Sequence, residues 1–156
     1  MIVADPTIAA ARELLDDAID ELRKALDGCS ADELNHRPAG DETNGLAVLA
    51  THAVHSTRAW LSLAVGAPLP VRDRPAEFAV VVEDPVAFLS GFDELAASCR
   101  AVLATDRSFD PALVGTAPWR PGELANAPVT AAWALIHAIA HLREHVGHAQ
   151  LTRQVV

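Results

Sequence analysis

Four of the seven histidines lie close together near the C-terminus, within residues 135–151. Three of them, His137, His141 and His145, are spaced four residues apart, and His148 follows three residues later. On a helix with about 100° per residue, all four fall on one face. Neutral imidazoles one turn apart are typical of metal coordination. The alternative is a polar row at the surface, or a hydrogen-bonded row in the interior.

A fifth histidine, His52, is expected to face the core from an earlier helix. A helical projection places Val48, Leu49, Ser56 and Leu63 within about 60° of it. A single histidine in such a stripe is ordinarily a hydrogen-bonded core residue. His52 becomes a candidate ligand because a second helix brings its own row of histidines.

Two ligands from the row and one from the earlier helix would make a three-histidine site. Side chains four residues apart on a helix reach the same ion, but this spacing does not distinguish His137 with His141 from His141 with His145. Three protein ligands leave a position for water or substrate, which is the pattern of catalytic metal sites. A thiol bound there would be deprotonated and become a nucleophile.

The elements that must position these histidines are four amphipathic helices. Helical spacing predicts them over residues 6–27, 44–64, 85–104 and 130–153. Asp5-Pro6 and Asp84-Pro85 each pair a capping residue with a proline at the first helical position. Two long connections separate the last three helices: residues 66–84, with a short extended piece expected at Phe78–Val82, and the irregular residues 106–129. The prediction is an all-α four-helix bundle in one domain, residues 1–156.

Composition excludes several classes of protein. The net charge of -9 argues against binding to nucleic acid, which needs clustered lysine and arginine. No apolar run is long enough to cross a bilayer, and the N-terminus lacks the basic start of a signal peptide. Two cysteines, Cys29 and Cys99, do not form a disulfide framework. A cytoplasmic location is therefore expected, with no membrane partner.

Two stretches of the chain resemble the DinB superfamily of metal-binding four-helix bundles. The first, ELNHRPAGDETNGLAVLATHAVHSTRAWL, is similar to that family's loop, asparagine and second helix. That pattern has one histidine followed by an arginine and an aromatic residue, which here are His52, Arg58 and Trp60.

The second stretch, HAIAHLREHVGHAQLTR, resembles the last helix of the family. The family's pair of ligands four residues apart, followed by a glycine, falls on His141, His145 and Gly147. The Gly-His-Ala run, with Leu151 and Arg153 after it, resembles an actinobacterial branch that includes mycothiol-dependent transferases and isomerases.

This resemblance implies a divalent metal ion held by His52, His141 and His145. Members of the family bind zinc, nickel or iron, so the identity of the ion does not follow. The resemblance also implies an up-down-down-up bundle, whose second and third helices run parallel, and often a homodimer. The implied reaction is transfer or isomerisation involving a low-molecular-weight thiol.

Other residues are candidates for the surroundings of the metal. His137 and His148 are expected either to support the ligands and line a pocket, or simply to be buried with a hydrogen bond. Arg58 is a candidate to bind a substrate carboxylate, against the alternative of an exposed helix arginine. Trp119, in the second long connection, either closes over a pocket or packs on its own loop.

Three functions remain open on the sequence. The first is a metal-dependent thiol transferase or isomerase. The second is a non-enzymatic bundle that binds a metal or small molecule in a stress response. The third is a structural helical interaction domain whose histidines bond to one another and to backbone carbonyls.

Overall fold

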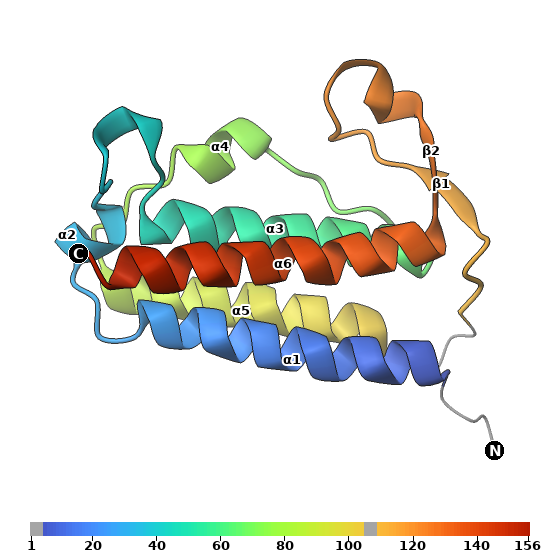
Figure 1. Ribbon diagram of the computed structural model, residues 1–156, viewed down its shortest axis with the longest axis horizontal. Coiled ribbons are helices and arrows are strands. Elements are labelled where there is room, and N and C mark those ends of the chain that lie inside the picture. Colours follow the sequence, from blue (N-terminus) through green and yellow to red (C-terminus); the bar gives the residue numbers. More distant parts are fainter. Residues whose placement is uncertain (1–4, 105–108) are drawn as a thin grey trace.

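The computed structural model describes residues 5–104 and 109–156, and within them the chain is mostly helical. Four long helices account for most of this part (Figure 1): α1 (Pro6–Leu26), α3 (Leu46–Ala64), α5 (Pro85–Ala104) and α6 (Ala131–Arg153). Short elements lie in the connections, namely α2 (Ala31–Asn35), the 3₁₀ turn η1 (Gly40–Glu42), α4 (Arg74–Phe78), β1 (Val114–Thr116), the 3₁₀ turn η2 (Gly122–Asn126) and β2 (Pro128–Thr130).

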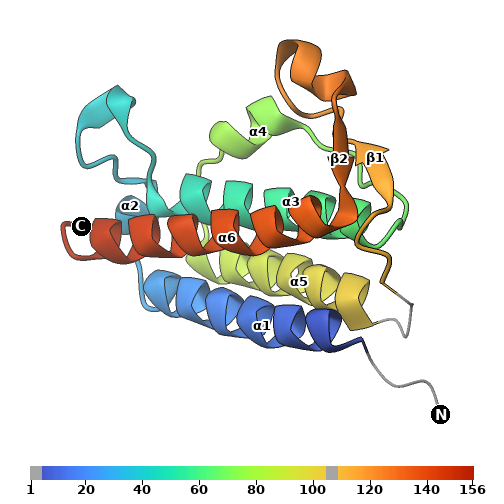
Figure 2. The ribbon, with the colours of Figure 1, turned by 45° about the vertical axis from the view of Figure 1, so that its right-hand side comes forward.

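The long helices form two layers, α3 with α6 and α1 with α5 (Figure 2). By the colours of the sequence in Figure 1, α3 and α5 run in one direction while α1 and α6 run in the other. The short helix α4 and the segment from β1 to β2 lie on the outer side of the α3/α6 layer (Figures 1 and 2). Within residues 5–104 and 109–156, these segments cover the outer side of α3 and α6, and no comparable segment covers the α1/α5 layer.

The predicted helix starts are confirmed where a capping residue marks them. The Asp5 side chain accepts hydrogen bonds from the backbone N–H groups of residues 7 and 8, and Asp84 does the same for residues 86 and 87. Thr130 accepts one from the backbone N–H of Trp133 at the start of α6. The second predicted helix begins at Leu46, two residues later than expected, because Gly45 is its N-cap.

The first long connection differs from the expectation of an extended piece at Phe78–Val82. Residues 74–78 instead form the one-turn helix α4, and residues 79–82 belong to no strand. The turn forms because the Asp73 carboxylate accepts a hydrogen bond from the Ala76 N–H at 3.1 Å and Pro75 lies in the first turn. The connection then returns to α2, where the Asn35 side chain bonds both backbone polar groups of Val82, at 2.7 and 2.8 Å.

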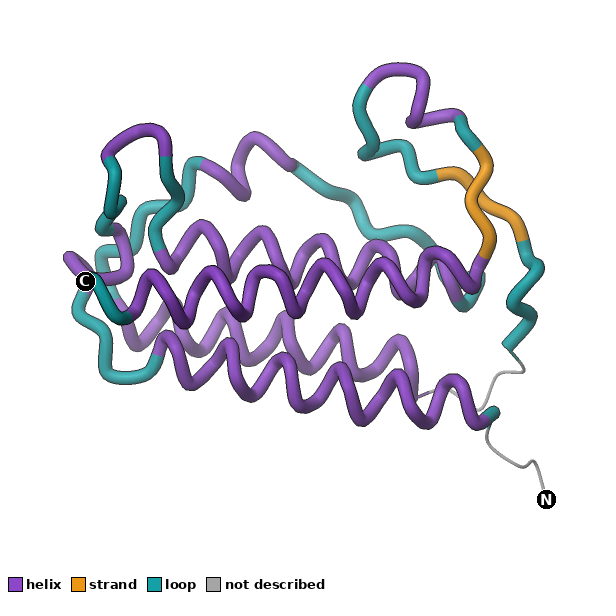
Figure 3. Tube along the Cα trace, viewed as in Figure 1, coloured by secondary structure: helices purple, strands orange, loops and turns teal. Residues whose placement is uncertain are grey.

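The second long connection is not wholly irregular, and the chain is not strictly all-α. In the described part of this connection, β1 and β2 pair as an antiparallel ladder (Figure 3), with Val114 opposite Thr130 and Thr116 opposite Pro128. Strands of three residues are too short to show the alternation by which a sequence predicts strands. Residues 105–108 of this connection lie outside the described residues.

The core lies between the two helical layers. On α6, Leu135, Leu142 and Val146 are buried. On α1, Leu15 is buried, whereas its neighbour Leu14 is 47% exposed. Both cysteines are buried free thiols. None of the described helices combines the length and apolar character that crossing a membrane requires.

Candidate metal centre

Three histidines from α3 and α6 converge where these two helices pack together. One ring nitrogen each of His52, His141 and His145 lies within 4.8 Å of the other two. The Nε2 atoms of His141 and His145 are 3.3 Å apart. The His52 ring meets both rings edge-on, with centroid distances of 5.3 and 5.1 Å.

The spacing of these nitrogens fits a single cation. Two nitrogens bound to a tetrahedral zinc at about 2.0–2.1 Å would lie about 3.3–3.4 Å from each other, close to the separation of the His141 and His145 Nε2 atoms. Of the two pairs that the spacing allowed, it is His141 with His145 that shares a cluster with His52. Three imidazole nitrogens suit zinc, nickel and iron alike, so the donor set leaves the identity of the ion open.

The electrostatics keep all three rings neutral. Burial, with some repulsion from neighbouring histidines, lowers the pKa of His141 to about 3 and that of His145 to about 4. Burial also lowers the pKa of His52, although its hydrogen bond to Glu77 opposes this. Near pH 7 each ring therefore has a nitrogen lone pair, which a metal ligand needs.

In two of the three rings, one buried nitrogen has no hydrogen-bond partner among the described residues. The Nδ1 atoms of His141 and His145 are buried and have no hydrogen-bond partner among the described residues. The polar contact that these two rings do make is the one between their Nε2 atoms. Burying polar groups in this way costs free energy. A shared ion would engage the two Nε2 atoms, while the Nδ1 atoms would stay without a partner among the described residues.

A carboxylate and an arginine that the sequence analysis missed complete the cluster. Glu77, on α4, lies with its Oε2 atom 2.9 Å from the Nδ1 atom of His52. Arg72 donates to both carboxylate oxygens of Glu77, from Nε to Oε1 at 2.9 Å and from Nη2 to Oε2 at 2.6 Å. Burial opposes ionisation of Glu77, but the hydrogen bonds from Arg72 and His52 outweigh it and lower the pKa of the carboxyl.

These two residues were missed because they lie in a connection without periodicity, 20 and 25 residues beyond His52. A usable signal was present, namely an aspartate two residues before Pro75, which marks the start of a short helix that carries a glutamate. His52 itself is 6% exposed and Glu77 is 3% exposed, so the pair is part of the interior.

Aromatic side chains continue the cluster toward the N-terminal end of α6. The His137 ring stacks on Trp133 with a centroid distance of 4.6 Å and an angle of 11°. It also meets Trp60 edge-on at 4.7 Å and lies 5.5 Å from His141. Trp119 packs edge-on against Trp60 at 5.2 Å, so it contacts α3 rather than only its own loop. Trp133 is 43% exposed, so this aromatic row extends from the histidine cluster to the surface.

Comparisons with known proteins agree with this geometry. A family model described as Mycothiol-S-transferase matches residues 10–156. This chain belongs to the mycothiol-S-transferase family. The resemblance to the DinB superfamily is thereby confirmed.

A solved structure has the same fold as this mycothiol-S-transferase family member. It is described as a conserved protein from Enterococcus faecalis and is 22% identical in sequence, with a TM-score of 0.69 over 95% of each chain. At that identity the likeness concerns the fold alone. A comparison with curated proteins found no match.

The remaining candidates of this mycothiol-S-transferase family member lie farther from the cluster. His148 is exposed, and its ring lies 5.9 Å from that of His145. Arg58 lines a hollow of about 340 Å³ between α3 and α5, together with Ser62 and Ser98. The structure thus brings His137 against the candidate ligand His141 but places Arg58 at a different surface.

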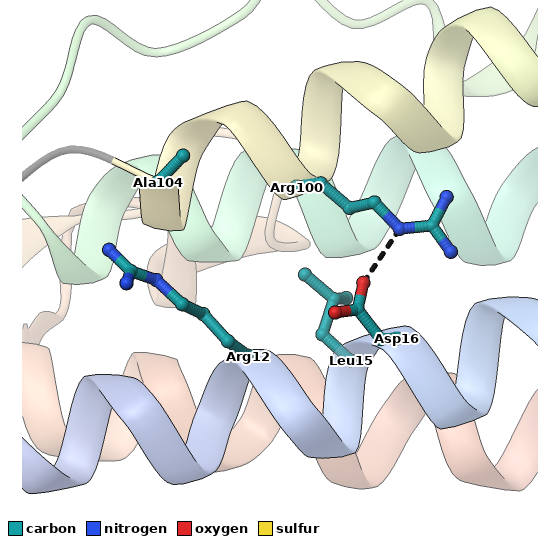
Figure 4. A pocket seen from close by; sticks show the side chains of 5 residues that line it. All are labelled: Arg12, Leu15, Asp16, Arg100 and Ala104. Atoms are coloured by element: carbon teal, nitrogen blue, oxygen red, sulfur yellow. Dashed lines mark hydrogen bonds and ion pairs between the residues drawn. The ribbon is translucent and has the colours of Figure 1, made fainter.

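A second hollow, of about 250 Å³, lies between α1 and α5 (Figure 4). Arg100 crosses it to bind Asp16 at 2.6 Å, and Arg12 donates to the carbonyl oxygen of Leu103. Neither helix carries a histidine, so this hollow offers none of the metal-binding chemistry found between α3 and α6.

Proposed function

We propose that this protein is a divalent-metal-dependent S-transferase for a low-molecular-weight thiol of the mycothiol type. The metal ligands are His52, His141 and His145, and the whole chain is one DinB-like four-helix bundle. The directions of the four long helices, with α3 parallel to α5, support this up-down-down-up arrangement. Membership of the mycothiol-S-transferase family supports the thiol as one substrate.

The observation that carries the proposal is the convergence of three neutral imidazoles from two helices. Their ring nitrogens lie within 4.8 Å of one another, and burial keeps the pKa of His141 and of His145 well below 7. A divalent ion bound there would lower the pKa of a thiol and so supply a thiolate nucleophile near pH 7.

The chain's own residues prepare the site for that chemistry. α6 holds His141 and His145 one turn apart on a rigid element, and α3 brings His52 against them. Three protein ligands leave room for a substrate atom. Trp133 is 43% exposed and stacks on His137 beside the ligands. Its flat aromatic surface suits contact with the organic part of a substrate.

The test combines metal content with turnover. The protein is purified without a metal-affinity column, analysed for metals, stripped with chelator and reloaded separately with zinc, nickel or iron(II). Conjugation of mycothiol to a fluorogenic alkylating agent is then followed, with glutathione and cysteine as comparison thiols. We expect one ion per chain and metal-dependent conjugation that is fastest with mycothiol.

A pair of variants on α6 provides the control. His141→Ala should lose both metal and turnover, whereas His148→Ala, which changes an exposed histidine of the same helix, should keep both. Metal well below one ion per chain in the wild type, or equal metal content in His141→Ala, would contradict the ligand set. One ion per chain without turnover of any thiol would instead support a non-enzymatic metal-binding protein.

We also propose that the protein works in the cytoplasm, where low-molecular-weight thiols are kept reduced, and that it forms a homodimer. Exposed apolar side chains on α6, Ile136 and Leu151, support self-association. Sedimentation at several protein concentrations distinguishes a dimer from a monomer.

A further inference from the structure

We propose that Glu77 is a positioning residue for His52, which it fixes in the tautomer that leaves Nε2 free to bind the metal. The proposal deepens the proposed function and depends on it for the metal itself. Its first step, the choice of tautomer, concerns the metal-free chain and is measured independently.

The tautomer follows from the hydrogen bond. The Oε2 atom of Glu77 lies 2.9 Å from the Nδ1 atom of His52, and both side chains are buried. A carboxylate only accepts hydrogen bonds, so the proton of this bond belongs to the imidazole Nδ1. In a neutral ring the other nitrogen, Nε2, then carries the lone pair. His52 thus presents an acceptor to His141 and His145 rather than an N–H group.

Arg72 holds the carboxylate in the orientation that this bond requires. Its guanidinium donates to both oxygens of Glu77, and its own side chain is 5% exposed. A bidentate arginine–carboxylate contact of this kind fixes the plane of the carboxylate. The Arg72 guanidinium also lies 5.9 Å from the ring centroid of Trp119, so a residue of the second long connection also packs against it.

Local structure explains why Glu77 reaches His52 from a connection. The capping bond of Asp73 and the proline at residue 75 make α4 a defined turn rather than a flexible segment. Phe78, the last residue of that turn, packs on the His52 ring with a centroid distance of 4.6 Å. The imidazole is therefore held by a hydrogen bond at its Nδ1 edge and by a packed ring.

The other two candidate ligands have no such support. The Nδ1 atoms of His141 and His145 lack a hydrogen-bond partner among the described residues. His52 is thus the ligand whose orientation is set from outside the histidine cluster. Loss of a carboxylate that orients a metal-binding histidine typically lowers metal affinity about 10- to 100-fold, and we expect that range for loss of Glu77.

The experiment reads the tautomer and the metal affinity separately. Long-range ¹H–¹⁵N correlation spectra of the metal-free protein report which nitrogen of His52 carries the proton, and competition with a chromophoric chelator gives the zinc dissociation constant. The variants are Glu77→Gln and the double variant Arg72→Met with Glu77→Leu. The double variant removes the acceptor without leaving a buried arginine unpaired, so it is expected to fold.

We expect the wild type to show the Nδ1–H tautomer of His52. The double variant, which has no hydrogen-bond acceptor at residue 77, should lose that preference and bind zinc about 10- to 100-fold more weakly. Glu77→Gln keeps an amide oxygen that can accept from Nδ1–H, so it should weaken the preference and the affinity less than the double variant does. Glu144→Gln is the matched control, since it neutralises an exposed carboxylate between His141 and His145 on α6. It should change zinc affinity by no more than about fivefold, as for other exposed charges.

Two results would overturn the proposal. One is a double variant that keeps the Nδ1–H tautomer and binds zinc as the wild type does. The other is weak binding in Glu77→Gln that the double variant restores, because the unpaired charge of Arg72 would then be responsible. A wild-type chain that binds no zinc but shows the Nδ1–H tautomer would refute the proposed function and leave the role of Glu77 in choosing the tautomer intact.

Discussion

Acidification of the metal-free protein should destabilise it through His141 and His145. In the unfolded chain each imidazole has its ordinary pKa of 6.5, whereas in the folded chain burial lowers the pKa of His141 to about 3 and that of His145 to about 4. The unfolded state therefore binds more protons as the pH falls below 6.5. A group with a lowered folded-state pKa of this kind contributes stability at neutral pH that is lost as the pH drops toward the folded value.

The size of the effect follows from these values. At pH 5 both rings are almost fully protonated in the unfolded chain and almost unprotonated in the folded one. Between pH 7 and pH 5, each ring therefore lowers the free energy of unfolding by at most about 2 kcal/mol, and the pair lowers it by at most about 4 kcal/mol. For a chain of this size that corresponds to a fall in Tm of roughly 8–16 °C.

The assay is urea unfolding, followed by circular dichroism, of chelator-treated protein at several pH values between 7 and 5. The comparison variant is His141→Gln with His145→Gln, which keeps polar side chains but removes both titrating groups. Over that pH range, the free energy of unfolding of the wild type should fall by about 4 kcal/mol more than that of this variant. Equal losses in the two proteins would refute the reasoning, because every other titrating group is common to both.

Three further changes have expected outcomes. Zinc at 100 times its dissociation constant should stabilise the protein by about 2.7 kcal/mol and raise its Tm by roughly 5–11 °C, which scanning calorimetry with and without chelator measures. Gly45→Ala should destabilise the protein by roughly 1–3 kcal/mol, because the new Cβ would lie 2.9 Å from the backbone oxygen of His36. In Gly147→Ala the new Cβ meets nothing within 4 Å, so this variant should gain up to about 1 kcal/mol of helix stability. Urea unfolding of the two variants measures both changes. Asn35→Ala removes both bonds to Val82 and should cost about 1–3 kcal/mol, with faster hydrogen exchange of the Val82 amide than in the wild type.

The sequence predicted the long helices well because each has repeated apolar residues at helical spacing, and α1, α5 and α6 also begin at a capping side chain. Asp5, Asp84 and Thr130 all cap the helices that were expected to follow them. The candidate histidines also stood out, since three residues of one type at a spacing of four are uncommon by chance. The structure brings His52, His141 and His145 together, although the spacing alone left two ligand pairs open.

The connections were predicted poorly because their contacts depend on partners distant in the sequence. Glu77 reaches His52 only when α4 packs over α3, and no pattern in residues 66–84 indicates which histidine Glu77 will contact. The ladder of β1 and β2 joins two segments of three residues, each too short for a pattern. Long helices can be predicted from local periodicity, whereas a one-turn helix or a short strand pair depends on tertiary contacts.

The candidate ligands come from α3 and α6, whereas Trp119 and Glu77 reach the same cluster from the connections outside that layer. The candidate donor residues and the residues that pack around them are therefore encoded in separate stretches of the chain. Substitutions in the connections can therefore alter the surroundings of the histidine cluster without changing any of the three candidate donor residues.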